Sequence, residues 1–314
     1  MAAHQGGGRV ALATSGSTGR PRSVVRTTES WVASFPAFSA LTGTGATSRV
    51  WVPGPLTATM NLFAAVHARF VGAGVESRPD HATHAQLTPS ALRRCLDEGT
   101  PLDGVTVVVA GDRLPPALHG RAVAAGARVC HYYGAAELSF VGWGEHAAGL
   151  RPFPGVDVSV RDGEIWVRSP FLCSGYDGGL AGPLRRDGAG FATVGDRGVL
   201  SDGLLTVAGR DDAVTTAGAT VHVADVEEHL RAAAFGEVVV VGLPHPQLGA
   251  VLAAVLTDPA DHGPLRASAR SGLAAVQRPR VWFHVAPLPQ TAAGKVDRRA
   301  LVAMVTSPSA RRLV

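Results

Sequence analysis

The stretch GVTVVVAGDRLPPALHGRAVAAGARVCHYY, residues 104–133, holds two short apolar runs separated by a helical pattern. The runs GVTVVVAG (104–111) and ARVCHYY (127–133) are rich in β-branched and aromatic residues, which is typical of buried strands. The stretch LPPALHGRAVAAG (114–126) between them has the spacing of a packed helix. Because two strands joined by a helix usually lie parallel, residues 104–133 predict a mixed α/β fold.

Similar predicted strands and helices extend toward the N-terminus. RVALAT (9–14) predicts another buried strand of this parallel type, and PSALRRCLDEG (89–99) predicts another helix. From about residue 151 the pattern changes to GVDVSVRDGEIWVRSP, with an Asp-Gly turn, followed by the Gly-rich stretch 175–190. This part predicts a small β-barrel or meander.

The sequence pattern changes again after Arg210. VADVEEHLRAAA (223–234) predicts a helix, EVVVVGLP (237–244) and AVLAAVL (250–256) predict strands, and TDPADHGPLRASARSG (257–272) predicts a loop. We therefore expect two domains, residues 1–210 and residues 211–314.

Composition narrows the class of protein. The 314 residues are 46% hydrophobic and 17% charged, which is typical of a globular chain with a sizeable core. The net charge of +4 comes without a Lys/Arg block, so nucleic-acid binding is disfavoured. The first ten residues lack an apolar signal region and no apolar run reaches membrane-spanning length. Three dispersed cysteines, Cys95, Cys130 and Cys173, fit a reducing cytoplasm and no cysteine metal site.

The stretch TSGSTGRPR (14–22) follows a predicted strand and is suited to bind phosphate. Small residues let successive backbone N–H groups point at one anion, and hydroxyl groups add donors. The residues concerned are Thr14, Ser15, Gly16, Ser17, Thr18 and Gly19. It is not the GxxxxGK[ST] loop. The alternative interpretation is a flexible Ser/Gly linker.

Two further stretches could contact a nucleotide. In HYYGAAEL (131–138) a tyrosine ring could stack on a purine and Glu137 could hold Mg²⁺, or the tyrosine could be a core residue and Glu137 a surface one. In VGDRGVLSDGLLTVAGRDD (194–212), Asp202-Gly203 predicts the turn of a hairpin that Asp196 and Arg210 flank. Asp196 could accept from ribose hydroxyls and Arg210 could meet a hydroxyl or phosphate. As an isolated pair, Asp196 and Arg210 would more often be a surface ion pair.

The stretch TAAGKVDRRAL (291–301) contains Lys295, the only lysine among 29 Lys and Arg residues. Lysine is a compact point charge on a thin stem, whereas arginine is a planar fork, so a single retained lysine suggests a narrow site. The alternative is drift in an Arg-favouring genome, with Gly294 and Lys295 in an ordinary turn.

Together these stretches resemble the acyl-adenylate-forming superfamily of acyl-CoA synthetases, adenylation domains and luciferases. TSGSTGRPR, YGAAE, VGD, GRDD and PQTAAGKVDR stand in the family's order across about 290 residues. THAQLTPSALRRCL (83–96) and AGATVHVADVEEHL (217–230) are most similar to o-succinylbenzoate-CoA ligases. The resemblance implies an α/β fold: a shortened large domain of mixed sheets, helices and a small β-barrel, followed by a small mobile α+β domain.

The resemblance also implies a reaction. The family uses ATP and Mg²⁺ to convert a carboxylic acid to an acyl-adenylate, and acid–CoA ligases then form a thioester with CoA. Lys295 would bridge the substrate carboxylate and the α-phosphate, and Glu137 would carry Mg²⁺. The implied nucleotide contacts are residues 14–19 and Arg22 for phosphates, Ala110, Gly111, Asp112 and Tyr133 for adenine, and Asp196 and Arg210 for ribose, with Gly134 as a further nucleotide-binding residue.

Three other functions follow from the resemblance. Asp211 or Asp212 would be the hinge of a domain alternation, and Gly218 would line the tunnel for the CoA arm. Thr57, Ala58 and Thr59, in GPLTATMN (54–61), would line the substrate pocket. No Asp lies in that stretch to pair an α-amino group, so an aryl, keto or aliphatic acid is favoured over an amino acid.

The chain also departs from the family pattern. Ala136 and Val194 replace threonines, and only about a dozen residues precede the phosphate loop, so we expect a homodimer or a partner protein to cover the exposed surface. Two alternatives to the CoA ligase stay open. One is adenylation with transfer to a carrier protein or an amine, and the other is a non-catalytic remnant that binds a nucleotide or a partner.

Overall fold

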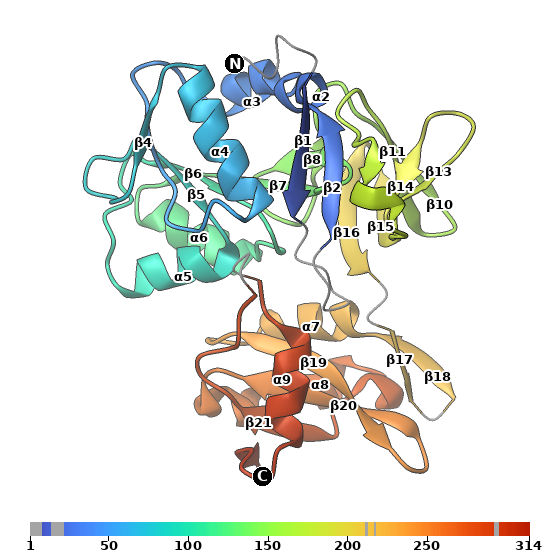
Figure 1. The fold of residues 1–314 in the computed structure, drawn as a ribbon. Helices are drawn as coiled ribbons and strands as arrows, with labels where there is room; N and C mark the ends of the chain where they lie inside the picture. The colour runs from blue at the N-terminus through green and yellow to red at the C-terminus, as the bar shows by residue number, and fades with distance from the viewer. Residues whose placement is uncertain (1–7, 14–21, 211–212, 217, 292–294) are drawn as a thin grey trace. The chain divides into compact units, whose positions relative to one another are not determined.

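The computed structural model describes residues 8–13, 22–210, 213–216, 218–291 and 295–314. The chain divides into two compact units (Figure 1). The first comprises Met1–Val207 and Ala292–Lys295, and the second comprises Ala208–Thr291 and Val296–Val314. The predicted boundary after residue 210 lies three residues beyond this division, and the functional roles assigned to the two domains stay predictions.

A seven-stranded sheet is the largest sheet of the first unit, with strand order β4-β3-β5-β6-β7-β8-β9. Five strands run parallel and the last two antiparallel. Their bounds are Gly74–Glu76 (β4), Arg49–Trp51 (β3), His84–Leu87 (β5), Thr106–Val109 (β6), Arg128–Ala135 (β7), Ser139–Gly144 (β8) and Arg151–Pro152 (β9). The parallel pairing predicted for residues 104–133 is confirmed, because β6 and β7 pair in parallel register.

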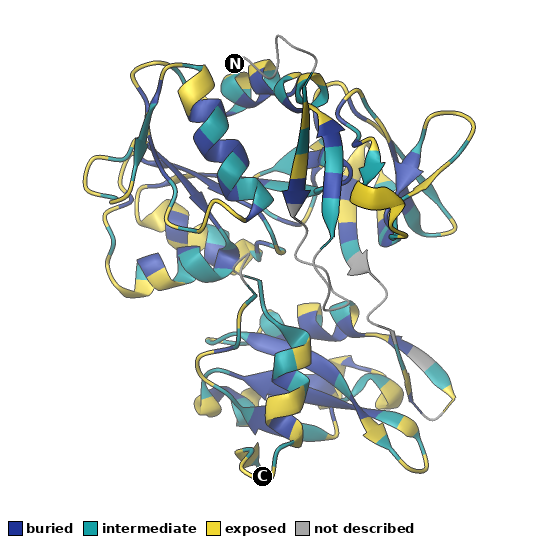
Figure 2. Ribbon diagram, viewed as in Figure 1, coloured by how far each residue is buried: buried dark blue, intermediate teal, exposed yellow. Residues whose placement is uncertain are grey.

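Helices cover both faces of this sheet (Figure 1). Helices α5 (Pro89–Asp97) and α6 (Pro116–Ala124) cover one face, where Val107 and Val109 join their apolar cluster. On the other face, α3 (Phe35–Thr42) and α4 (Thr59–Phe70) pack over Val108. Successive residues of β6 are therefore buried on opposite sides, which explains the unbroken apolar run in the sequence (Figure 2).

The predicted strand at residues 9–14 does not belong to that parallel sheet. It is β1 (Arg9–Ala13), which pairs antiparallel with β2 (Ser23–Thr27), and β12 (Gly175–Tyr176) adds a third strand beyond β2. The expectation of a parallel strand was wrong here. The physical reason is visible in its burial, because Arg9 and Ala11 are exposed while Leu12 is buried, as in a half-solvated antiparallel strand. The short helix α2 (Thr28–Val32) follows β2.

The alternating region after residue 151 forms a six-stranded sheet, β13-β14-β11-β15-β16, with β10 on β11. Its strands are Asp157–Arg161 (β10), Glu164–Arg168 (β11), Arg185–Arg186 (β13), Ala192–Thr193 (β14), Asp196–Ser201 (β15) and Leu204–Arg210 (β16). Asp162 and Asp202, each followed by glycine, have φ of 52°. Both Asp-Gly pairs thus form the two-residue hairpin turns that the sequence predicts.

The second unit has the sheet order β18-β17-β20-β21-β22, with β19 on β20. The strands are Ala213–Thr216 (β17), Ala219–His222 (β18), Val238–His245 (β19), Gly249–Leu256 (β20), Val281–His284 (β21) and Arg312–Leu313 (β22). Helices α7 (Val223–Arg231) and α8 (His262–Gly272) pack on one face and α9 (Arg298–Thr306) on the other, so alternate valines of β19 enter two separate cores. The predicted helix at residue 223 and the strands at 237–244 and 250–256 are confirmed.

The stretch 257–272, predicted as a loop, contains a helix instead. A short 3-10 turn (Pro259–Asp261) leads into α8, which buries Leu265 and Ala269 against the core. Pro264 is tolerated because it lies in the first turn, where backbone N–H groups have no partner within the helix. The abundance of Pro, Gly and Asp concealed a helix with only two buried apolar positions.

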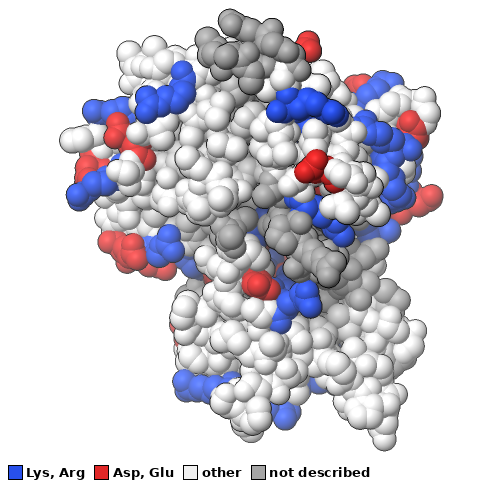
Figure 3. Space-filling model, in the orientation of Figure 1, with Lys and Arg blue, Asp and Glu red and all other residues white. Residues whose placement is uncertain are grey.

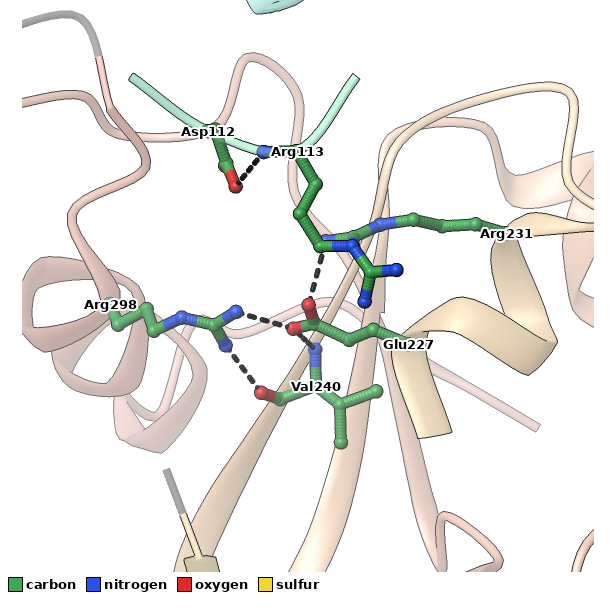
Figure 4. A network of polar contacts seen from close by, with 6 residues as sticks. All are labelled: Asp112, Arg113, Glu227, Arg231, Val240 and Arg298. Carbon is green, nitrogen blue, oxygen red and sulfur yellow. Dashed lines mark hydrogen bonds and ion pairs between the residues drawn. The ribbon is translucent and has the colours of Figure 1, made fainter. Parts of the chain in front are cut away.

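A buried carboxylate ties three elements of the second unit together (Figure 4). Glu227 of α7 is 2% exposed and accepts hydrogen bonds from Arg231, from Arg298 of α9 and from the backbone N of Val240 on β19, at 2.6, 2.6 and 2.8 Å. Arg298 also donates to the carbonyl of Val240 at 2.7 Å. Charge-assisted bonds to a buried acid are strong, so this network fixes the start of α9. Within the part of the chain that the structure describes, no helix is long and apolar enough to cross a membrane.

Candidate functional site

Tyr133 and Asp196, which lie far apart in the sequence, are in contact in the first unit. Tyr133 lies on β7 and Asp196 begins β15. The Tyr133 hydroxyl donates to Asp196 Oδ2 at 2.7 Å, and the Asp196 side chain is buried. The structure thus brings together a residue predicted to frame adenine and one predicted to hold ribose. A phenol that donates to one carboxylate oxygen also fixes the direction in which the carboxylate points.

Glu137 lies in the turn between β7 and β8 and is 4% exposed. The hydroxyl of Tyr176, on β12, donates to Glu137 Oε1 at 2.9 Å and accepts from the backbone N of Leu184 at 3.2 Å. A Cβ on Gly182 would overlap the Tyr176 ring. Tyr176 is therefore held from two sides while it orients the Glu137 carboxylate. The alternative interpretation of Glu137 as a surface residue is wrong.

Arg26 of β2 lies next to this turn and is 1% exposed. Its Nη2 donates to the carbonyl of Ala136 at 2.8 Å, while its Nε is buried with no hydrogen-bond partner. Burial lowers the pKa of Arg26 to about 10, and the nearby Cys173 and Glu137 oppose that shift. The guanidinium therefore stays charged near neutral pH and adds a positive charge beside Glu137.

Sequence reasoning missed both Arg26 and Tyr176. Tyr176 lies in the stretch 175–190, whose Gly-rich sequence does not indicate a residue that orients a carboxylate. The sequence SVVRT (23–27) does not indicate that Arg26 is buried, but in the structure β2 buries alternate residues, Val24 and Arg26. An arginine on the buried face of a strand is unusual unless it has a partner. Burial and Glu137 also raise the pKa of the Tyr176 hydroxyl, which keeps it a hydrogen-bond donor at physiological pH.

Gly134 marks an irregularity in the pairing of β7 with β8. The register shifts between Tyr133 and Gly134, and a Cβ on Gly134 would collide with the backbone carbonyl of Ser139. Ser139 itself has a φ of 62°. The close approach of two backbones thus requires glycine at position 134.

We expect Gly134→Ala to lower the free energy of unfolding by about 2 kcal/mol or more, because the added methyl group meets backbone rather than a movable side chain. Gly120→Ala is the matched control, since the space around Gly120 in α6 is open. That change should raise stability by about 0.5 to 1 kcal/mol through helix propensity. Urea unfolding of the two variants checks both signs. Equal stability of Gly134→Ala and the original protein would contradict the role of this contact.

The segment after β6 turns sharply at Gly111. The backbone N of Ala110 donates to the carbonyl of Leu87 at 3.1 Å, and Gly111 has a φ of +94°, which disfavours any other residue. Asp112 is exposed, and its Oδ1 accepts from the backbone N of Arg113 at 2.7 Å. Backbone groups are thus presented at the carboxyl end of a parallel strand, where α/β proteins commonly bind ligands.

Lys295 belongs to the first unit and lies near this turn. A Cβ on Gly111 would be 3.2 Å from Met60 Sδ, 3.5 Å from Thr88 Cγ2 and 3.7 Å from Lys295 Cε. The Lys295 side chain is half-buried. The single lysine of the chain therefore approaches the backbone predicted to frame adenine.

The chain after Lys295 is firmly held. Asp297 caps α9 by accepting from the backbone N of Arg299 and of Ala300 at 3.1 and 3.0 Å. Arg298 enters the Glu227 network described above. Lys295 thus precedes a fixed helix start, a feature that the sequence motif did not explain.

The other predicted site residues are placed as follows. Ala58 is buried at the start of α4, and its carbonyl accepts from the backbone N of Asn61 and of Leu62. Of its neighbours, Thr57 is exposed and Thr59 is half-buried. Arg22 is half-buried, Arg210 ends β16, and Gly218 has a φ of +78° in the β17–β18 turn. Thr14, Ser15, Gly16, Ser17, Thr18, Gly19, Asp211 and Asp212 lie outside the described residues. The substrate, phosphate, hinge and tunnel roles stay predictions.

A magnesium site would depend on Glu137. Among the described residues, no three His, Cys, Asp or Glu side chains form a group able to hold a metal ion. The hydrogen bond from Tyr176 uses Oε1, and no described residue bonds Oε2. One available carboxylate oxygen fits an ion that takes its other ligands from water and nucleotide phosphates, as Mg²⁺ usually does.

The sequence profile of AMP-binding enzymes matches residues 10–177 of the chain. The chain belongs to this family. An uncharacterized acyl–CoA ligase of Bacillus subtilis, YhfT, is 29% identical, with 91% of this chain aligned to 66% of that protein. The 2-succinylbenzoate–CoA ligase of Salmonella typhimurium is 29% identical, with 92% of this chain aligned to 67% of that protein.

A solved structure supports the same assignment. The structure of E. coli MenE with bound OSB-AMS superimposes with a TM-score of 0.81 at 26% identity, covering 94% of this chain and 68% of MenE. The predicted family and its α/β fold are thereby confirmed. This AMP-binding enzyme spans about two thirds of the length of these relatives.

Proposed function

We propose that the protein is an acid–CoA ligase, which activates an organic carboxylic acid with ATP and transfers the acyl group to CoA. The observation that carries the proposal is the approach of Lys295 to the Gly111 turn, where its Cε lies 3.7 Å from the position of a Cβ on Gly111, within a unit that also joins Tyr133 to Asp196. A nucleotide-framing backbone, a ribose-binding acid and a compact cation are the parts that adenylation requires. The names of the similar ligases support it.

In the proposed first step, a carboxylate oxygen attacks the α-phosphorus of ATP and pyrophosphate leaves. The new bond joins the acyl oxygen to phosphorus, and the broken bond joins the α-phosphorus to the bridging oxygen. Lys295 would neutralise charge on the reacting oxygens, and Tyr133 would hold Asp196 toward the ribose hydroxyls. Mg²⁺, held through Glu137, would neutralise phosphate charge.

In the second step, the thiolate of CoA attacks the acyl carbon, AMP leaves and a thioester forms. Gly218 would let the pantetheine arm pass, since its side-chain position has no atom within 4 Å among the described residues. Positioning and charge neutralisation account for both steps, so no covalent enzyme intermediate is required.

Pyrophosphate release tests this proposal. The protein is incubated with Mg-ATP and aryl, keto, aliphatic and amino acids, with and without CoA, and 2-succinylbenzoate belongs in the panel because of the named relatives. We expect acid-dependent release, at least about tenfold faster with aryl or keto acids than with amino acids. CoA should accelerate release and accumulate as acyl-CoA, because thiolysis clears the adenylate.

The other outcomes separate the alternatives. Adenylate formed without any CoA effect would indicate transfer to a carrier protein or an amine. ATP binding without turnover on any acid would indicate a non-catalytic nucleotide-binding protein. Turnover on amino acids would contradict only the interpretation of Thr57, Ala58 and Thr59.

The expected homodimer or partner protein and the cytoplasmic location also stay predictions. Phe70, which is 45% exposed at the end of α4 and packs edge-on against Phe35, is the kind of apolar residue that a partner would cover.

A further inference from the structure

Arg26 on β2 is a buried cation that forms no ion pair with any described residue. Its side chain is 1% exposed, and it is the one arginine or lysine among the buried residues of the described chain. Its guanidinium has a single hydrogen-bond partner among the described residues, the carbonyl of Ala136, and its Nε is buried without one. A buried charge is costly unless an opposite charge compensates it, so the position of Arg26 requires an explanation.

Arginines at two other places in the chain have acidic partners. Arginine side chains over β10–β14 reach the surface (Figure 3), and there Arg161 bonds Asp187 at 2.6 Å. In the second unit, the buried carboxylate of Glu227 bonds two arginines. Arg26 has neither solvent exposure nor a described carboxylate in contact, so it differs from both groups.

The carboxylate near Arg26 is that of Glu137. Arg26 Nη2 donates to the carbonyl of Ala136, the residue before Glu137, at 2.8 Å. No hydrogen bond or ion pair between described residues joins the two charged side chains, so they are neighbours held apart by a backbone carbonyl. Burial lowers the pKa of Arg26 to about 10, and Cys173 and Glu137 oppose that shift. Attraction across this gap stabilises both buried charges.

Two strands of the small sheet hold the turn between β7 and β8. Strand β2 provides Arg26, and β12, which pairs with β2, provides Tyr176, whose hydroxyl donates to Glu137 Oε1 at 2.9 Å. The backbone N of Cys173 donates to the carbonyl of Glu137, also at 2.9 Å. The carbonyls of Ala136 and Glu137 and the carboxylate are thus all hydrogen-bonded. These bonds fix the carboxylate relative to Arg26.

We propose that Arg26 is a positioning residue that acts as the internal counter-ion of Glu137 and prevents this carboxylate from binding free Mg²⁺. The inference rests on the proposed function, in which Glu137 carries the Mg²⁺ of Mg-ATP. A fixed cation beside the carboxylate repels a divalent ion that arrives alone, whereas the phosphates of ATP offset that repulsion when the ion arrives with the nucleotide. The site therefore selects the Mg-ATP complex over free Mg²⁺.

Titration of the full chain with Mg²⁺ alone, without nucleotide, tests the proposal by calorimetry and by the shift in Tm. Arg26→Met removes the charge, so we expect it to bind Mg²⁺ at least fivefold more tightly than the original protein and to gain a rise in Tm with Mg²⁺. Arg26→Lys keeps a positive charge and should respond to Mg²⁺ as the original protein does. Arg26→Gln is a second uncharged variant, which retains a donor for the Ala136 carbonyl and should respond as Arg26→Met does.

Arg128→Met is the matched control. Arg128 also donates to backbone carbonyls, those of Leu41 and Thr42, but it lies at the start of β7, the end away from the β7–β8 turn. Its loss should lower stability without changing the response to Mg²⁺. Circular dichroism establishes that each variant is folded, and Arg26→Gln replaces Arg26→Met if the apolar variant unfolds.

Glu137→Gln separates this inference from the proposed function. In the double variant Arg26→Met/Glu137→Gln, the gained Mg²⁺ binding should be lost, because the carboxylate provides it. Equal Mg²⁺ affinity in Arg128→Met and in both uncharged Arg26 variants would overturn the role of Arg26, even where Glu137→Gln abolishes the effect of Mg²⁺ on ATP affinity as the proposed function requires. Mg²⁺ binding that persists in the double variant would overturn both, since the metal would then bind elsewhere.

Discussion

Replacing Lys295 with alanine should abolish acyl-adenylate formation while ATP affinity changes by no more than several-fold. Lys295 is the only lysine of the chain, and its Cε lies 3.7 Å from the position of a Cβ on Gly111. A cation at that place would act mainly on charge that develops between the carboxylate and the α-phosphate. Losing it should raise the barrier by about 3 kcal/mol or more, which corresponds to roughly 150-fold in rate.

Single-turnover formation of the adenylate measures this effect directly, and equilibrium binding of ATP gives the ground-state affinity. Lys295→Arg separates charge from shape, because it retains the positive charge but replaces a thin stem with a planar fork. We expect the Arg variant to fail as well, since Met60 and Thr88 crowd the same turn. An Arg variant of normal activity would show that any cation suffices, and adenylate formation by Lys295→Ala at the original rate would remove the assigned role.

Local sequence patterns predicted the elements whose signal is contained within a few residues. Residues 104–133 predicted β6, α6 and β7 because each apolar run is short, buried on both faces and ended by glycine or proline. Asp162-Gly163 and Asp202-Gly203 predicted two hairpins because few other pairs accept positive φ at both positions. These features need no knowledge of distant parts of the chain.

Elements that depend on distant contacts were missed or misassigned. Helix α8 buries only Leu265 and Ala269, so its periodic signal is weaker than that of its Pro and Gly residues. Strand β1 has the apolar composition of a parallel strand, and only its pairing with β2 shows that it is antiparallel. In both cases tertiary packing outweighs local preference.

In the candidate site too, the sequence predicted individual residues that belong to local motifs but not the contacts between distant residues. Motifs named Tyr133, Glu137 and Asp196 separately, but no local pattern could show that Tyr133 donates to Asp196 across two sheets. Tyr176 belongs to a strand of two residues, too short to be seen in a sequence. Residues that orient other residues carry little signal of their own, because their function depends on the partner's position.

Replacing Glu137 with glutamine should lower the rate of adenylation at least about 100-fold, equivalent to roughly 2.7 kcal/mol. Glu137 is the predicted Mg²⁺ ligand, and the change keeps its shape while removing the charge that an ion of this kind requires. It also leaves buried Arg26 without a nearby carboxylate, so we expect about 1 kcal/mol of lost stability as well. Glu145→Gln is the matched control, because Glu145 is exposed just after β8.

Metal dependence distinguishes loss of a ligand from loss of structure. In the original protein, Mg²⁺ should tighten ATP binding, and in Glu137→Gln that effect should disappear while ATP binding without metal is unchanged. Tyr176→Phe removes the donor to Oε1 but keeps the carboxylate, so it should raise the Mg²⁺ concentration for half-maximal rate several-fold and retain most activity at saturating Mg²⁺. If Glu137→Gln retained the Mg²⁺ effect on ATP affinity, the Tyr176–Glu137 pair would be a structural link between β12 and the β7–β8 turn, and the metal would have to bind elsewhere.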